Sequence, residues 1–170
     1  MKKHFLIFGL FLLFISCQDN SPLETINVDN KYSLDVFTNM SKSTELNDEA
    51  SLQYQNIFKE LYVVVIDEST EQFDRIINDY ELQENYNADL EGYTNLIVDG
   101  FDADADIKIV SELQDITING LEAKLLEFGG KVNEYDVYYK LAFVKSQKSY
   151  YQIMTWTLLE NKDKLKEKMD

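Results

Sequence analysis

Histidine and cysteine are almost absent from this chain of 170 residues. His4 is the only histidine and Cys17 is the only cysteine, so both lie within the first seventeen residues. The chain beyond them cannot build a Ser-His-Asp triad, a Cys-His nucleophile pair or a zinc site of the usual Cys/His type. Haem and iron–sulfur ligation by histidine or cysteine is excluded there for the same reason.

Positive charge is also scarce. The chain has 16 Lys and Arg against 31 Asp and Glu, a formal net charge of −15, and Arg75 is its only arginine. Binding to nucleic acid depends on cations that neutralise phosphates, so we expect no nucleic-acid partner. The phosphate-binding patterns GxxxxGKS/T and GxGxxG are missing as well. The composition indicates an acidic surface that repels polyanions.

The first sixteen residues have the layout of an export signal. Lys2 and Lys3 precede an apolar run over residues 5–15, which is typical of a secretory signal. These eleven residues are too few to cross a bilayer core, which needs roughly 20 in a helix. We therefore expect no retained transmembrane anchor. An ordinary secretory peptide is the alternative, and it would leave Cys17 as a thiol without a partner in the chain.

The end of this signal, Phe14-Ile15-Ser16-Cys17, resembles the lipobox of bacterial lipoproteins, with phenylalanine in place of the usual leucine. The resemblance implies that Cys17 is lipidated and becomes the new N-terminus after residues 1–16 are removed. Two or more acyl chains hold a protein stably on a membrane. The next residues, Gln18-Asp19-Asn20, weakly resemble the surface-export cue of Bacteroidetes lipoproteins. We expect a protein of the cell envelope, with the outer or inner membrane and the face left open.

Two further segments follow the signal. Residues 17–31 are predicted to be a lipidated N-terminus and a flexible tether, because polar residues such as Asp19 and Asn30 dominate them. Fully extended, such a tether spans at most ~45 to 50 Å. Residues 32–170 match one globular domain of common size and can bury a real core.

Alternating and continuous apolar runs predict the first half of the domain. Strands are expected over residues 32–36, 52–57 and 61–66, the last of them buried on both faces. Ser69 and Gln72 form a capping-box pattern that opens a helix, whose apolar stripe is Phe73, Ile76, Ile77 and Tyr80. A second helix is expected from about residue 88 to residue 98, with Asp99-Gly100 as its end.

The second half is predicted to be rich in strands. Asn119-Gly120 is a strong hairpin signal. The expected strands cover residues 107–113, 115–118, 121–128, 137–144 and 150–157, and a closing helix covers residues 158–169. This order predicts an α+β domain in which a mixed or mostly antiparallel sheet is covered by helices.

The element order resembles that of the PsbP-like superfamily. The residues that carry the resemblance are the opening strand Tyr32–Val36, the strand region 56–67 before the central helix, the turn and strand at residues 118–123, and the late strand ending at Thr157. The resemblance implies an α/β/α sandwich over most of residues 32–169. It also implies a binding or assembly factor without catalysis, and it supplies no catalytic residue.

An acidic run invites a calcium interpretation. Asp102, Asp104 and Asp106 alternate along it, and carboxylates are hard oxygen ligands. An EF-hand loop counted from Asp102 would have Ile107 at its sixth position and Leu113 at its twelfth, where glycine and glutamate are required. The pattern therefore favours a solvated acidic loop, and we predict no metal and no cofactor.

Aromatic residues supply the candidate binding surface. Tyr135, Tyr138 and Tyr150 belong to an aromatic cluster that also includes Trp156. Such side chains line partner surfaces and ligand grooves, although strands ordinarily contain them too. We expect a non-catalytic module that binds a protein or envelope partner. The alternatives are a carrier of a small apolar ligand or glycan in a pocket between sheet and helices, and a hydrolase that uses two carboxylates.

Overall fold

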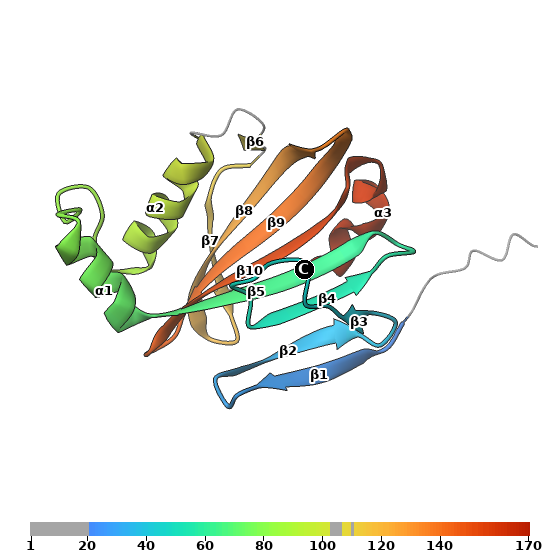
Figure 1. The fold of residues 1–170 in the computed structure, drawn as a ribbon, viewed down its shortest axis with the longest axis horizontal. Coiled ribbons are helices and arrows are strands. Elements are labelled where there is room, and N and C mark those ends of the chain that lie inside the picture. Colours follow the sequence, from blue (N-terminus) through green and yellow to red (C-terminus); the bar gives the residue numbers. More distant parts are fainter. Residues whose placement is uncertain (1–20, 103–106, 110) are drawn as a thin grey trace, which may run out of the picture.

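A computed structural model describes residues 21–102, 107–109 and 111–170, and Figure 1 shows its elements. An eight-stranded antiparallel sheet has the order β3-β4-β5-β10-β9-β8-β6, and β7 also pairs with β8. The strands are β3 (Ser41–Lys42), β4 (Leu52–Asn56), β5 (Leu61–Ser69), β6 (Ile107–Ile109), β7 (Gln114–Ile118), β8 (Leu121–Val132), β9 (Tyr135–Lys145) and β10 (Ser149–Leu158). The helical elements are α1 (Thr70–Asp79), α2 (Leu90–Asp102), η1 (Leu159–Asn161), α3 (Lys162–Leu165) and η2 (Lys166–Lys168).

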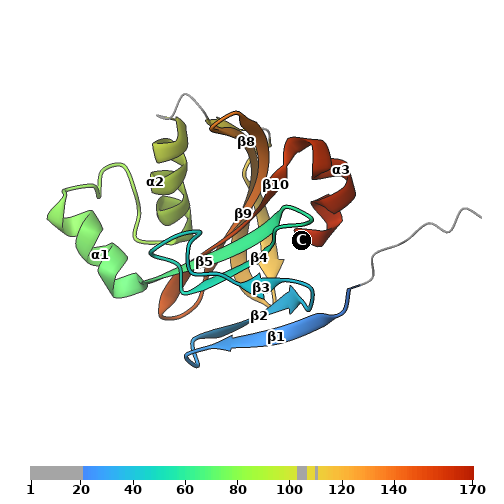
Figure 2. The ribbon, with the colours of Figure 1, turned by 45° about the vertical axis from the view of Figure 1, so that its right-hand side comes forward.

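Helices lie on both sides of this sheet. Figure 2 shows α1 and α2 on one side and α3 on the other. The predicted α+β class with a helix-covered antiparallel sheet is therefore confirmed. None of the helices in the described part of the chain is long and apolar enough to cross a membrane.

The prediction of a flexible tether over residues 17–31 is wrong for residues 23–28, which form a strand. Strand β1 (Leu23–Val28) pairs antiparallel with β2 (Tyr32–Phe37) as a separate two-stranded sheet. Asp29 and Asn30 turn the chain with positive φ values of 46° and 56°, which these residue types tolerate. The strand forms because Ile26 and Val28 alternate toward the core and pack against it. Residues 1–20, with the predicted signal and Cys17, lie outside the described residues.

Helix α1 begins where the capping pattern predicts. The Ser69 side chain accepts a hydrogen bond from the backbone N–H of Gln72 at 3.0 Å. On the apolar stripe, Phe73 and Ile77 are buried. The cap stabilises the start of the helix because it satisfies one of the free N–H groups of the first turn. The buried apolar stripe stabilises the helix in addition.

We expect replacement of Ser69 by alanine to lower the free energy of unfolding by about 1 kcal/mol, the usual cost of losing a side-chain N-cap. Urea denaturation of the purified protein measures this loss. Thr44→Ala, which truncates an exposed hydroxyl residue, is the control and should change stability by less than ~0.5 kcal/mol. Equal stability of the two variants would contradict the capping role.

Each face of the sheet carries a buried core, and the alternation of side chains in β9 contributes to both. Leu141 and Phe143, each 0% exposed, point into the core beneath α1 and α2. Tyr138 and Val144 point to the opposite face and join the core that the β1–β2 hairpin and Leu165 of α3 cover. The sheet therefore separates two cores.

Two predicted helices differ from the structure. Helix α2 continues past Gly100 to Asp102. The closing helix is divided into η1, α3 and η2, because Leu158 still belongs to β10 and only Leu165 and Met169 reach the core. The predicted hairpin at Asn119-Gly120 is confirmed, with φ values of 51° and 82°. Residues 103–106 of the acidic run lie outside the described residues.

Candidate functional site

Two of the three tyrosines predicted to form a partner surface are buried. Tyr135 is 63% exposed, whereas Tyr138 and Tyr150 are each 1% exposed. Tyr150 stacks on Tyr93 with ring centroids 4.3 Å apart, and Tyr138 lies beneath Lys162, whose Nζ is 4.3 Å from the ring centroid. Strand alternation places these side chains on opposite faces, but both faces are covered at those positions. The prediction for Tyr138 and Tyr150 is wrong.

A different set of aromatic residues forms a continuous row across four strands and α2. We call it the ring row: Tyr62 of β5, Trp156 of β10, Tyr139 of β9, Phe128 of β8 and Phe101 of α2. Successive ring centroids are 5.1, 6.1, 4.7 and 5.1 Å apart. The strand register explains the row, because Trp156 lies opposite both Tyr62 and Tyr139, and Tyr139 lies opposite Phe128. Directly opposed aromatic side chains stabilise a sheet.

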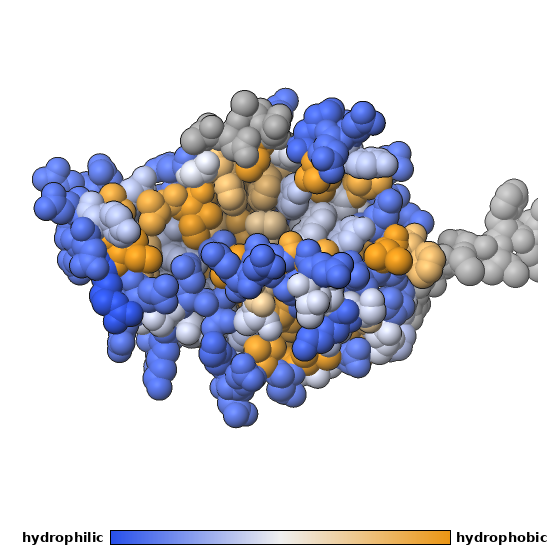
Figure 3. All heavy atoms as spheres, in the orientation of Figure 1, coloured by the Kyte–Doolittle hydropathy of each residue, from blue (hydrophilic) through white to orange (hydrophobic). Residues whose placement is uncertain are grey.

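The ring row is only partly covered. Tyr62, Trp156 and Tyr139 are half-buried. They line two adjoining hollows of about 260 and 330 Å³, which share Val132 and Trp156. Figure 3 looks onto this face, where pale and orange residues line a hollow beside α2 and blue residues surround it. Tyr135, which prediction did place on the surface, lies at the rim of the second hollow.

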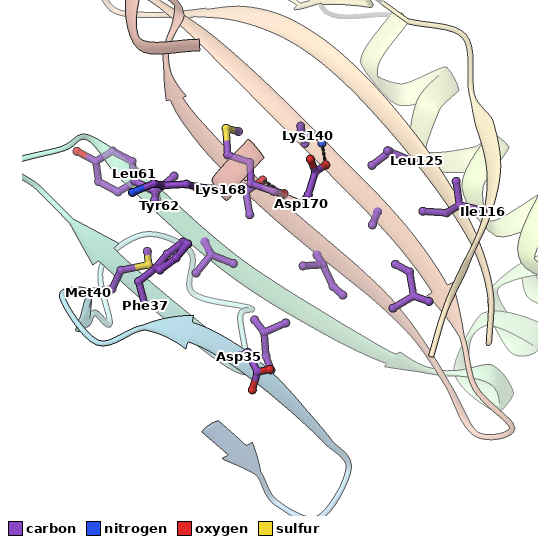
Figure 4. Close-up of a pocket in the computed structure, with 17 residues that line it drawn as sticks. Asp35, Phe37, Met40, Leu61, Tyr62, Ile116, Leu125, Lys140, Lys168 and Asp170 are labelled. Carbon is purple, nitrogen blue, oxygen red and sulfur yellow. Dashed lines mark hydrogen bonds and ion pairs between the residues drawn. The ribbon is translucent and has the colours of Figure 1, made fainter. Parts of the chain in front are cut away.

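A pocket of about 350 Å³ lies on the opposite face of the sheet. In Figure 4, Phe37 and Met40 from the β2 end lie across the pocket from Ile116 of β7 and Leu125 of β8. Ala142 and Ile153 form part of its floor. The walls are therefore mainly apolar, and they come from segments far apart in the sequence.

One buried cation interrupts these apolar walls. Lys140 is 4% exposed, and its Nζ forms an ion pair with the carboxylate of Asp170. The pKa of the Lys140 ammonium is lowered, mainly because the group is buried. The Glu127 carboxylate raises this pKa, and the positive charge of Lys166 lowers it. An ammonium in a mainly apolar enclosure needs an anionic partner, since removal of that partner leaves an uncompensated charge.

A second ion pair lies beside it. The Lys166 Nζ is 2.9 Å from the Glu127 carboxylate. Burial by itself would raise the pKa of Glu127, but the hydrogen bond and the positive charge of Lys166 oppose it, and the pKa of Glu127 lies below its usual range. Glu127 is therefore ionised at neutral pH and contributes negative charge next to Lys140.

No group of three His, Cys, Asp or Glu residues within the described ranges could hold a metal ion. The acids that line the pocket have other partners. Asp35 accepts a hydrogen bond from the Thr25 hydroxyl, and Asp170 pairs with Lys140. The described residues offer a ligand aromatic contact on one face, and apolar contact beside the Lys140 and Lys168 ammonium groups on the other.

Comparison with known proteins identifies the fold. The solution structure of CyanoP, the cyanobacterial PsbP of Synechocystis sp. PCC 6803, matches with a TM-score of 0.51 over 88% of each chain, at 11% identity. This chain has a PsbP-like fold. A crystal structure of a Pseudomonas aeruginosa protein of unknown function matches with a TM-score of 0.42 and 12% identity, over 85% of this chain and 89% of that one. No family model and no curated protein matches the sequence.

The PsbP-like sheet thus presents two different candidate sites. The ring row crosses β5, β10, β9 and β8 on the face that α1 and α2 leave partly open. The pocket lies between the other face of this PsbP-like sheet, the β2 end and the segment after α3. Sequence analysis singled out Trp156 in the aromatic cluster but missed Tyr62 and Lys140. Only strand pairing brings Tyr62 to Trp156.

Proposed function

We propose that this protein is a lipid-anchored module of the cell envelope that binds a protein partner through the ring row and performs no catalysis. The observation that carries the proposal is the row of adjoining aromatic side chains, some stacked and some tilted, beside an open hollow. Aromatic residues held in well-packed hollows supply a large share of the binding energy at protein interfaces. Tyr and Trp suit such positions because each combines a large apolar surface with a polar group.

Charge around the hollows indicates what the partner presents. Glu60 lines one hollow, and Glu134 and Asp48 are exposed beside residues that line them. The exposed Lys131 is paired with Asp136 at 3.2 Å. A partner with an apolar or aromatic segment flanked by basic residues therefore fits this surface, since opposite potentials across an interface favour encounter and register.

The proposed anchor restricts where this partner lies. Only six positions separate Cys17 from the start of β1 at Leu23, and a chain of that length spans at most ~20 Å. The backbone C=O of Pro22 already accepts a hydrogen bond from Thr38. Lipidation of Cys17 would thus hold the domain close to the membrane, and the partner would be a membrane protein or a protein held at the membrane.

The two alternatives rank behind this proposal. A small-ligand carrier is favoured by the pocket on the opposite face, and that site is argued separately below. A hydrolase would need two carboxylates that face each other across a cleft. In the pocket, Asp35 and Asp170 are instead engaged with Thr25 and Lys140, which favours binding over acid/base chemistry.

Site-specific crosslinking in the native membrane tests the proposal. A photoreactive amino acid at Val132, which lines both hollows, should yield a discrete adduct. The same probe at Tyr80, 73% exposed at the end of α1, is the control and should not. Trp156→Ala should weaken the Val132 adduct roughly 30-fold, because loss of a central aromatic contact costs about 2 kcal/mol or more.

Trp156→Phe keeps a ring in the row and should retain most of the adduct. Circular dichroism and a melting curve for each variant establish that the domain is folded. Identical adducts from positions 132 and 80, or an adduct that survives Trp156→Ala in a folded protein, would refute a partner site at the ring row.

A further inference from the structure

The pocket opposite the ring row combines an apolar enclosure with one buried cation, Lys140. A second lysine, Lys168, also lines the pocket, with its Nζ 5.5 Å from the centroid of the Phe37 ring. Its volume of about 350 Å³ lies at the small end of the range of roughly 300 to 1,000 Å³ for ligand sites. The Lys140 ammonium, on a side chain that is 5% exposed, lines this enclosure. Such a combination is suited to a ligand with one anionic group on an apolar body.

The anion now at Lys140 comes from an exposed residue. The Asp170 side chain is 61% exposed, although it pairs with a buried ammonium. Thr155 Oγ1 donates a hydrogen bond to the backbone C=O of Met169 at 3.3 Å. This bond holds Met169, the residue before Asp170, over the pocket. An exposed carboxylate regains its hydration when it leaves, whereas Lys140 cannot stay unpaired. A second carboxylate can therefore replace Asp170 at low cost.

We infer that this pocket binds a medium-chain aliphatic monocarboxylate, with its carboxylate on Lys140 Nζ in place of Asp170 and its chain along Leu125, Ala142 and Ile153. The inference does not rest on the proposed partner binding, because Lys140, Leu125, Ala142 and Ile153 lie outside the ring row, although Tyr62 lines both sites. Apolar contact supplies binding energy, and the charge-assisted hydrogen bond to Lys140 fixes the orientation.

The neighbouring charges select a monoanion. Glu127 lies close enough to act on Lys140 electrostatically, and Lys166 is paired with Glu127 at 2.9 Å. A dianionic head would meet the negative charge of Glu127, and a cationic head would meet Lys140. An uncharged alcohol of the same length would keep the apolar contacts but leave the Lys140–Asp170 pair in place.

Titration with decanoate and with decanol tests this assignment. The protein is the mature chain from residue 17 with Cys17→Ser, which needs no detergent and retains every described element. Calorimetry should show decanoate binding at least tenfold more tightly than decanol, and saturating decanoate should raise Tm. Lys140→Met should abolish the preference for decanoate while decanol binding persists.

Two further variants sharpen the result. Lys131→Met makes the same change of charge at an exposed lysine and should keep the preference for decanoate. Asp170→Asn removes the internal competitor at an exposed position and should tighten decanoate binding several-fold. No binding of decanoate, equal binding of decanoate and decanol, or an unchanged preference in folded Lys140→Met would overturn the inference. None of these outcomes bears on the Trp156 adduct.

Discussion

Replacing Gly92 by alanine is expected to displace the first turn of α2 and to destabilise the whole domain. A Cβ atom at this position would lie 1.9 Å from the backbone O of Asn87 and 2.5 Å from its backbone N. Real atoms do not approach so closely, and backbone cannot rotate away as a side chain does. We expect a loss of ~3 kcal/mol, the upper end of the usual cost of overpacking, which lowers Tm by roughly 6 to 12 °C in a chain of this size.

The loss would reach both the core and the ring row, because α2 carries a residue of each. Tyr93 is 2% exposed, stacks on Tyr150 and accepts a hydrogen bond from Gln152 at 2.9 Å. Phe101 ends the ring row 5.1 Å from Phe128. Near-ultraviolet circular dichroism should therefore lose aromatic signal in the Gly92→Ala protein.

Gly100→Ala is the matched control within the same helix. No atom lies within 4 Å of a Cβ at Gly100, and the residue is exposed. Alanine is there the better helix former, so stability should stay equal or rise by about 0.5 kcal/mol. Thermal melts measure Tm for both variants. An equal fall in Tm would show that the close contact at Gly92 does not cause the loss of stability.

Replacing Cys17 by serine is expected to move the protein from the membrane fraction to the soluble fraction. Lipid on this residue is the anchor that we propose for the protein. Each buried CH₂ of an acyl chain contributes about 0.8 kcal/mol, and a diacyl anchor is effectively stable where one chain is marginal. Fractionation of cells followed by immunoblotting measures the change.

Ser16→Ala keeps a small residue before the cysteine and is the control for Cys17→Ser. It should leave both the lipid and the membrane location intact. Mass spectrometry of the mature N-terminus reports the modification directly. An unmodified thiol on Cys17, or an unchanged membrane fraction for Cys17→Ser, would remove the basis for anchoring.

Local chemistry predicted several elements well because their signals lie within a few residues of one another. Ser69 caps α1 through a neighbour three positions on. Asn119-Gly120 turns the chain because both residues accept positive φ. Strand β1 was missed because its alternation of Ile26 and Val28 is short and is surrounded by polar residues. Pairing with β2 compensates for that weak local preference.

The candidate sites depend on contacts between distant residues. Lys140 and Asp170 are thirty positions apart, one in β9 and the other after the end of η2. Tyr62 and Trp156 meet only because β5 and β10 pair in one particular register. Aromatic composition alone favoured Tyr138 and Tyr150, since nothing local distinguishes a tyrosine beneath a helix from one in an open hollow.

The amino-acid sequence by itself determined the acidic charge, the absence of histidine and cysteine chemistry beyond residue 17, and which residues of each strand share a face. Those properties follow from composition and from the two-residue period of a strand. Only the tertiary structure decided which part of each face is covered, because covering depends on where α1, α2, α3 and the β1–β2 hairpin pack. That packing buried Tyr138 and Tyr150, left the ring row open and enclosed Lys140 in an apolar pocket.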